Sequence, residues 1–308
     1  MQLVTVFTII LIGMIASRFI RDPKNYVKVL NDTVFNLFLP ALILTLLWKG
    51  DVTRLTPHFV LITLLPFFIT FLFVILILKA LRMDKDAIAI YPLASVFGNL
   101  AYLGLPLTSS ILGLNALEIA VLVVLIHSLT FFSFGIMWIS LITLGYINLK
   151  RITCSCVKNP LIISSILGVV LSAFKVPLPL FLSNILDMLG NVALPISLLL
   201  VGMWIGNELF HGRSFFNLKE LKDALLISFF KLFLLPLIFY LFLFLTRLNL
   251  SELEIRTITL QLSMPLAITN FIVAREYECH AGVIAKAVIL STLSLPLVIH
   301  ILGKFIIP

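Results

Sequence analysis

The sequence predicts an all-α integral membrane protein with ten transmembrane helices, two of which are broken. Of the 308 residues, 61% are hydrophobic and only 12% are charged, and the mean hydropathy is +1.18. A soluble domain of this size could not bury so much apolar surface. The apolar residues also form long stretches, and two of these stretches contain glycine, asparagine and proline where a spanning helix would otherwise continue.

The number of spans comes from the length of the apolar stretches. A bilayer core about 30 Å thick requires roughly 20 apolar residues in each spanning helix. Ten stretches meet or approach this length: 2–18, 29–48, 58–79, 87–113, 116–145, 159–175, 178–206, 221–246, 252–274 and 281–306. Only short connections remain between them, so the sequence predicts no soluble domain.

Basic residues are concentrated in alternate connections. The odd-numbered connections hold fourteen: Arg18, Arg21, Lys24, Lys28, Lys79, Arg82, Lys85, Lys150, Arg151, Lys158, Arg213, Lys219, Lys222 and Arg275. The even-numbered connections hold only five: Lys49, Arg54, Lys175, Arg247 and Arg256. The positive-inside rule therefore predicts that the odd connections are cytoplasmic. Both termini of a multi-pass cell-membrane protein are then expected on the non-cytoplasmic side, and the net charge of +8 does not indicate nucleic-acid binding.

The fourth and ninth stretches contain the interruptions. A helix in the bilayer can break only where its freed backbone groups are buried in protein or line a watery cavity. Transporters place their substrate sites at such breaks, near the bilayer midplane. We therefore expect a substrate-binding site that is formed by Gly98, Asn99, Tyr102, Gly104, Pro106, Pro265, Thr269 and Asn270.

The residue types at the breaks favour an anionic substrate. A helix that restarts near the midplane directs unpaired N–H groups and the positive end of its dipole into the cavity, where a carboxylate can bind. The carboxamides of Asn99 and Asn270 can donate hydrogen bonds to an anion without carrying a permanent charge. The sequence therefore predicts a secondary transporter of small organic anions such as carboxylates.

The two halves of the chain share motifs at corresponding spans. The matched pairs are Asn36 to Pro40 with Asn191 to Pro195, Leu64-Leu65-Pro66 with Leu234-Leu235-Pro236, and Pro106 with Pro265. They predict two five-helix repeats, at residues 1–145 and 159–308, joined by a cytoplasmic linker at 146–158. Because five is odd, the second repeat is expected to be inverted in the membrane.

Several of these residues resemble a known family, the auxin efflux carriers, which include PIN-FORMED proteins and bacterial malate and malonate permeases. Gly98-Asn99 with Gly104-Leu105-Pro106 is similar to the family's fourth span, and Met264-Pro265 with the run from Phe271 to Tyr277 and His280 is similar to its ninth. Asn159-Pro160 resembles the start of the sixth span, although Leu161 departs from the plant motif, and Lys231 fits the eighth. The long cytoplasmic loop of many plant carriers is missing, so the resemblance does not imply auxin as the substrate.

The resemblance implies a specific architecture and mechanism. Spans 4 and 9 would cross at their broken centres, and spans 1, 2, 6 and 7 would form a separate panel. An elevator-like movement between the panel and the other helices would give alternating access. The residues expected to support the transport panel or the site are Asn36, Pro40, Asn159, Asn191, Pro195, Asp187, Lys231 and His127.

Three ionisable residues within spans are functional candidates, because burying a charge in the bilayer is costly. Lys231 could pair with an anion or extend to the cytoplasmic interface. His127 could titrate, or could be a neutral histidine bonded to a neighbour. Asp187 could couple transport to a cation, or could be a solvated helix-end residue. The sequence leaves each pair of alternatives open.

Two other function classes are compatible with parts of this pattern. A sodium-coupled symporter of the bile-acid-symporter type would share the inverted ten-helix plan, and hydroxyls with carbonyls could hold its sodium. A membrane enzyme would need clustered ligands or a nucleophile, whereas the five histidines are scattered. No metal, cofactor or nucleotide-binding motif is expected, nor a disulfide among Cys154, Cys156 and Cys279. The expected partners are the anion and the lipid bilayer, and a homodimer stays open as an assembly.

Overall fold

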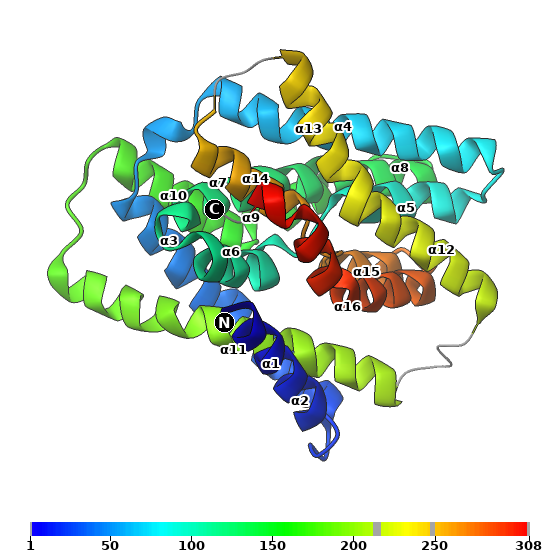
Figure 1. The fold of residues 1–308 in the computed structure, drawn as a ribbon, viewed down its shortest axis with the longest axis horizontal. Coiled ribbons are helices and arrows are strands. Elements are labelled where there is room, and N and C mark those ends of the chain that lie inside the picture. Colours follow the sequence, from blue (N-terminus) through cyan, green and yellow to red (C-terminus); the bar gives the residue numbers. More distant parts are fainter. Residues whose placement is uncertain (1, 212–216, 247–249, 307–308) are drawn as a thin grey trace. The chain divides into compact units, whose positions relative to one another are not determined.

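The computed structural model describes residues 2–211, 217–246 and 250–306, which form helices joined by short connections (Figure 1). Arg213 and Arg247, which contributed to the predicted charge bias, lie outside these residues. The chain divides into two compact units. Unit 1 consists of Met1–Thr56, Ala101–Leu125 and Val157–Ser214, and unit 2 of Pro57–Leu100, Ile126–Cys156 and Phe215–Pro308. Each unit therefore combines segments from both halves of the sequence, and the predicted repeat boundaries stay a prediction.

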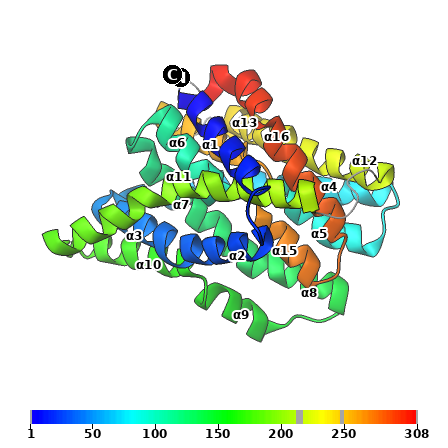
Figure 2. The same ribbon diagram turned by 90° about the horizontal axis from the view of Figure 1, so that it is seen from below.

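Unit 1 is organised around one long helix. Its helices are α1 (Gln2–Ala16), α2 (Pro23–Thr33), α3 (Leu39–Lys49), α6 (Leu105–Leu112), most of α7 (Asn115–Thr130), α10 (Pro160–Ala173) and α11 (Leu180–His211). Helix α1 packs along α11, and α3 packs against both α10 and α11 (Figure 2). Glycine permits the first contact, because a Cβ atom added to Gly202 would lie only 2.0 Å from the carbonyl oxygen of Ile10.

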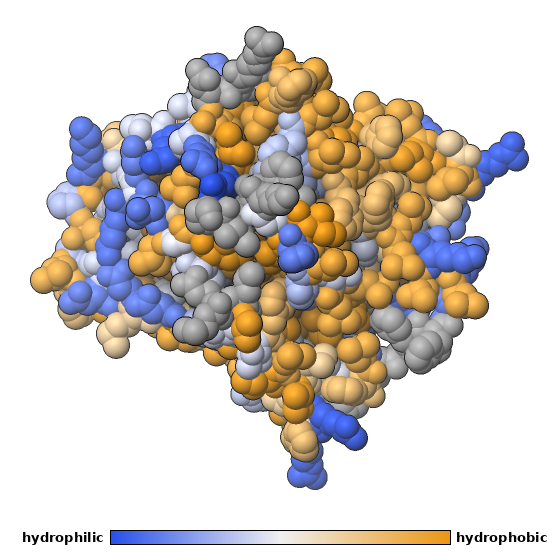
Figure 3. All heavy atoms as spheres, in the orientation of Figure 1, coloured by the Kyte–Doolittle hydropathy of each residue, from blue (hydrophilic) through white to orange (hydrophobic). Residues whose placement is uncertain are grey.

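Unit 2 contains the remaining helices. They are α4 (Pro57–Ala80), α5 (Lys85–Val96), α8 (Ile136–Leu144), α9 (Leu149–Val157), α12 (Leu218–Phe229), α13 (Leu235–Thr246), α14 (Glu252–Leu262), α15 (Ile268–Glu276) and α16 (Ala281–Ile306). Helix α4 packs against α5 and α13, and α12 packs along α16. Hydrophobic side chains cover the face over α4 and α13 (Figure 3), as expected for helices that contact lipid tails.

Wide π-helical turns precede three of the intramembrane prolines. The turns η1 (Val34–Phe38), η3 (Leu100–Gly104) and η5 (Phe230–Leu234) are each followed by a Leu-Pro pair that opens the next α-helix. In η1 and η5 the leucine N–H donates to the carbonyl five residues earlier, from Leu39 to Val34 and from Leu235 to Phe230. A proline in a helix interior lacks an N–H and clashes with the carbonyl four residues before it, and a π-turn relieves that conflict.

Among the residues that the structure describes, six helical segments are long and apolar enough to span a membrane: Pro23–Lys49, Pro57–Ala80, Asn115–Leu144, Leu180–Phe210, Leu218–Thr246 and Ala281–Ile301. A bent pair, Leu149–Val157 with Pro160–Ala173, makes seven if it is one span. The other three predicted spans are helical but short or interrupted: α1 has 15 residues, α5 ends before η3 and α6 begin, and α14 is separated from α15. The protein is a multi-pass membrane protein, and the count of ten stays a prediction.

Candidate functional site: the paired helix breaks of unit 2

Two helix breaks from distant parts of the chain lie side by side in unit 2. Helix α5 ends at Val96, and α14 is separated from α15 by residues 263–267. Between the breaks, Gly98 and Leu266 form an antiparallel β-bridge. The Asn99 N–H donates to the Pro265 carbonyl at 2.7 Å, and the Ala267 N–H donates to the Phe97 carbonyl at 3.3 Å. Backbone groups that the breaks remove from their helices are thus satisfied by the other break.

Side chains from other helices stabilise this pairing. The Asn270 carboxamide donates to the Phe97 carbonyl at 2.9 Å, and the Ser291 hydroxyl accepts a hydrogen bond from the Leu266 N–H at 3.2 Å. The Phe97 ring stacks on Phe131 with 4.0 Å between centroids. These contacts fix the backbone on both sides of the breaks, so the site is held by rigid elements.

A buried ammonium group lies at the breaks. Lys231, in η5, is 0% exposed, and its Nζ donates to the Leu262 carbonyl at the end of α14, 2.5 Å away. A Cβ atom added to Gly98 would lie 3.0 Å from this Nζ. Within the described part of the chain Lys231 forms no ion pair. An ammonium group has three donors, so this lysine can still bind an anion.

Polar groups near the lysine also lack protein partners. The Asn270 Oδ1 atom is buried without a hydrogen bond in the described residues. The Asn99 side chain is 4% exposed, and no hydrogen bond to it is found within those same ranges. Helix α15 begins here after Ala267, and no side chain caps it. Buried polar groups are normally hydrogen-bonded, so these groups mark a place where a ligand can bind.

Comparisons with known proteins identify the family of this chain. A family model described as membrane transport protein matches residues 1–143 and 147–302. The chain belongs to this family. The resemblance to auxin efflux carriers is thereby confirmed. The chain is also 25% identical over 303 residues to a protein of Methanothermobacter thermautotrophicus named as an uncharacterized transporter, and the match covers 95% of each chain.

The membrane transporter thus has Gly98, Asn99, Pro265 and Asn270 together in unit 2, with Thr269 half-buried in the first turn of α15. The other residues of the predicted site belong to unit 1. There Tyr102 donates to the Asn31 carboxamide oxygen at 2.9 Å, Gly104 ends η3, and Pro106 lies in the first turn of α6. The break itself is at 97–99, several residues before the proline that suggested it.

The asparagines and prolines predicted to support the panel or the site all lie in unit 1. Asn159 caps α10, accepting hydrogen bonds from the backbone N–H groups of Leu161 and Ile162 at 3.0 and 3.3 Å. The exposed Asn36 donates to the Asp32 carbonyl of its own helix, and Pro40 follows η1 in the first turn of α3. Asn191 and Pro195 lie on exposed positions of α11.

The ionisable candidates of the transporter differ in environment. Asp187 forms an ion pair with Lys49 at 2.7 Å, and both side chains are 42% exposed, which agrees with a solvated helix-end residue. His127 is fully buried, and its ring meets Phe67 edge-on with 5.4 Å between centroids. Lys231 does not extend to an interface, because its ammonium group is buried at Leu262.

Two contacts of the site join groups that the sequence does not connect. The Lys231 ammonium meets the Leu262 carbonyl at the breaks, and the Ser291 hydroxyl binds the backbone at Leu266. A charged residue in an apolar stretch made Lys231 a functional candidate, but that signal does not say which groups surround it. Ser291 carries no comparable signal, because buried serines often bond their own helix backbone.

Proposed function

We propose that this membrane transporter is a secondary carrier of small organic anions, most simply carboxylates, which bind at the paired breaks. The observation that carries the proposal is the fully buried ammonium of Lys231, which among the described residues has a carbonyl but no carboxylate as its partner. An isolated buried charge is costly. A bound carboxylate would neutralise it and would accept charge-assisted hydrogen bonds from it.

The neutral groups at the breaks support the same substrate class. The Asn99 carboxamide can donate to a second carboxylate oxygen, and the uncapped start of α15 contributes N–H groups and the positive end of a helix dipole. One fixed charge with neutral donors suits a carrier, which must release the anion after binding it. The site is therefore proposed to take a carboxylate whose remaining surface is small and uncharged.

Alternating access is proposed to be elevator-like. The division of the chain into two units, one of which carries the paired breaks, is what an elevator needs, since one unit would move relative to the other. In the proposed orientation the basic connections are cytoplasmic, and both termini are on the non-cytoplasmic side of the cell membrane.

Sodium-coupled symport is the second candidate, and one observation favours it. The unpartnered Oδ1 of Asn270 is an acceptor, as a sodium ligand must be. Lys231 opposes this assignment, because its ammonium group at the same breaks would repel a bound cation. Sodium-independent anion binding is therefore expected.

A thermal-shift screen of the purified protein tests the proposal. Carboxylates of increasing size are added with and without sodium, and a ligand that binds the folded state raises Tm by mass action. Lys231→Met should abolish the shift, whereas Lys28→Met, which removes an exposed lysine, should leave it unchanged. A shift that persists in Lys231→Met would contradict the proposed site, and a shift that requires sodium would favour symport.

A further inference from the structure

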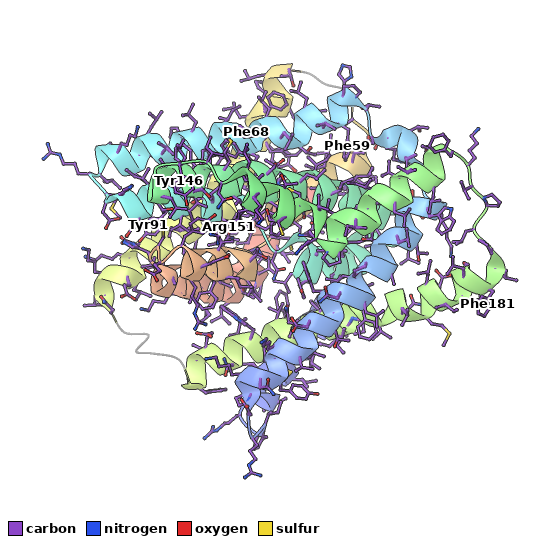
Figure 4. All side chains as sticks on the ribbon, turned by 180° about the vertical axis from the view of Figure 1, so that it is seen from behind. Phe59, Phe68, Tyr91, Tyr146, Arg151 and Phe181 are labelled. Carbon is purple, nitrogen blue, oxygen red and sulfur yellow. The ribbon has the colours of Figure 1, made fainter. Side chains whose placement is uncertain are left out.

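His127 is the polar member of an aromatic contact between two helices of unit 2. The ring of Phe67 on α4 meets the His127 ring near the end of α7, with 5.4 Å between centroids. Phe68, also on α4 (Figure 4), meets Phe134 of the following π-turn η4 (Phe131–Gly135) with 5.1 Å between centroids. The two helices therefore pack side by side here, and the imidazole of His127 lies in their interface.

The imidazole of His127 has no hydrogen-bond partner among the described residues. The side chain is 0% exposed, and neither Nδ1 nor Nε2 makes a hydrogen bond there. The Thr63 carbonyl lies near the ring, but not in hydrogen-bonding geometry. Even with a bond to that carbonyl, a neutral imidazole would keep one acceptor nitrogen without a donor. Because buried polar groups are normally hydrogen-bonded, the ring has an open position for a donor from a ligand.

Thr70 is a second buried polar group of this kind, on the same face of α4 as Phe67. It is 0% exposed, and its hydroxyl makes no hydrogen bond within the described part of the chain. Buried threonines in helices commonly donate to a carbonyl of their own helix. Thr63 does so, to the carbonyls of Phe59 and Val60 at 3.1 and 3.0 Å. The Thr70 hydroxyl is not used in this way, so it can donate to a ligand. We call His127 and Thr70 the mid-span pair.

The mid-span pair lies in the same region as the proposed carboxylate site. Thr70, His127 and Lys231 each lie near the middle of a segment long enough to span the membrane. Phe131, four residues after His127, stacks on Phe97 at the first helix break. The ammonium of Lys231 is also close enough for its charge to act on the His127 ring. Intramembrane polar groups of this kind are costly and typically functional.

We infer that the mid-span pair binds a hydroxyl group of the substrate, so that the anions carried are hydroxycarboxylates. The inference rests on the proposed function, because Lys231 and the paired breaks hold the carboxylate. The substrate hydroxyl donates to the acceptor nitrogen of His127 and accepts a hydrogen bond from the Thr70 hydroxyl. An acid without this hydroxyl leaves both groups unpaired, and sites built to bind a hydroxyl reject such analogues.

A hydroxyl suits the mid-span pair better than other substituents do. Either neutral tautomer of His127 has one acceptor nitrogen, and only a donor can satisfy it. A second carboxylate and a ketone oxygen are acceptors, so each would leave that nitrogen unpaired. An ammonium group could donate, but the charge of Lys231 would repel it. A hydroxyl both donates and accepts, and it adds no charge.

Isothermal titration of the purified wild-type protein tests the inference with acids that differ by one hydroxyl. The pairs are lactate with propionate, and 3-hydroxybutyrate with butyrate. The hydroxy acid of at least one pair should bind about tenfold more tightly. Equal affinities within both pairs would overturn the inference, since a trapped water would then occupy the mid-span pair, while the proposed function would stand. No binding of any of these acids would overturn the proposed function and the inference with it.

Variants show whether the preference for the hydroxy acid comes from the mid-span pair. His127→Phe keeps a ring against Phe67 but removes both nitrogens, and Thr70→Val keeps the side-chain shape but removes the hydroxyl. Each should lower the preference to about threefold or less. His127→Gln, which retains a donor and an acceptor, should recover part of it.

Thr63→Val is the matched control, because the Thr63 hydroxyl is already used within its own helix. It should keep the wild-type preference. Since the readout is a ratio of two affinities, a general loss of stability does not change it. A wild-type ratio in either His127→Phe or Thr70→Val would overturn the inference, and each variant serves if the other fails to fold.

Discussion

At the scale of single residues, burial and hydrogen-bond partners separate functional candidates from structural ones. Asn99 and Asn36 are the same residue type, yet Asn99 is 4% exposed beside the paired breaks, whereas Asn36 is exposed and bonds its own helix. Asp187 was a candidate for cation coupling, but Lys49 already neutralises it. The environment of each side chain therefore decides which role it can take.

Asn99→Ala should weaken anion binding by about 1–3 kcal/mol, the typical cost when a buried polar partner is lost. Isothermal titration with the carboxylate found in the thermal-shift screen measures this change. Asn36→Ala is the matched control and should bind normally, since its exposed carboxamide donates to the Asp32 carbonyl of its own helix. Unchanged affinity in folded Asn99→Ala would remove Asn99 from the site.

Cys279 should react very slowly with alkylating reagents at pH 8. Burial, and then the nearby carboxylates of Asp86 and Asp84, raise the pKa of its thiol to about 11. The thiolate is the reactive form, and at this pKa it is about one part in a thousand at pH 8. Mass spectrometry after timed alkylation should find the exposed Cys154 modified first. Equal rates for the two thiols would contradict this assignment.

At the scale of elements, the local sequence determines where helices begin and end, whereas the size of the facing side chains determines how closely two helices pack. Two helices start at caps whose contacts span only a few residues. Asn159 caps the helix that begins at Pro160, and Ser251 forms a capping box with Glu254. The close packing of α1 on α11 instead requires glycines at Gly13 and Gly202, where added Cβ atoms would lie 2.2 and 2.0 Å from carbonyl oxygens of the other helix.

Gly202→Ala should destabilise the transporter by about 1–3 kcal/mol, because overpacking a rigid contact forces the backbones apart. The affected atom is the Ile10 carbonyl oxygen, which cannot move away as a side chain could. Gly282→Ala is a suitable control, since the nearest atom to its added Cβ would be 3.4 Å away. Melting curves of the two variants should differ by several degrees, and similar curves would argue against close α1–α11 packing.

At the scale of the whole molecule, the two units interleave the halves of the sequence. Unit 2 contains α4 and α5 from the first half of the sequence and α12–α16 from the second half. The bridge between Gly98 and Leu266 therefore lies within unit 2 and joins the two halves of the sequence. The proposed inverted repeats and the proposed orientation in the membrane both depend on how many spans the chain makes.

The orientation predicts which side of the membrane each connection faces. Cys154 lies in the fifth connection and is exposed, so a membrane-impermeant maleimide should label it only from the cytoplasmic side in a Cys156→Ser background. Leu114, which is 70% exposed in the fourth connection, provides the control, because Leu114→Cys should be labelled only from outside. Labelling of both positions from one side would contradict ten spans.

The sequence alone determined the class of the protein, the family resemblance and the approximate place of both helix breaks. These properties depend on composition and on residues close together in the chain, such as Gly98-Asn99 and Met264-Pro265. The helix starts at Asn159 and Ser251 were predictable in the same way, because a cap and the N–H groups it binds are neighbours.

Only the tertiary structure decided which distant groups meet. Three contacts join residues that are far apart in the chain. They are the hydrogen bond from Asn99 to Pro265, the burial of Lys231 against Leu262, and the hydrogen bond from Tyr91 to Asp223. Hydrophobic periodicity carries no information about such pairings, since it reports which residues are buried and not what they are buried against. Asn99 and Asn270 lie at the paired breaks of unit 2, and Lys231 joins them there through the fold. Their role in binding a substrate stays a prediction.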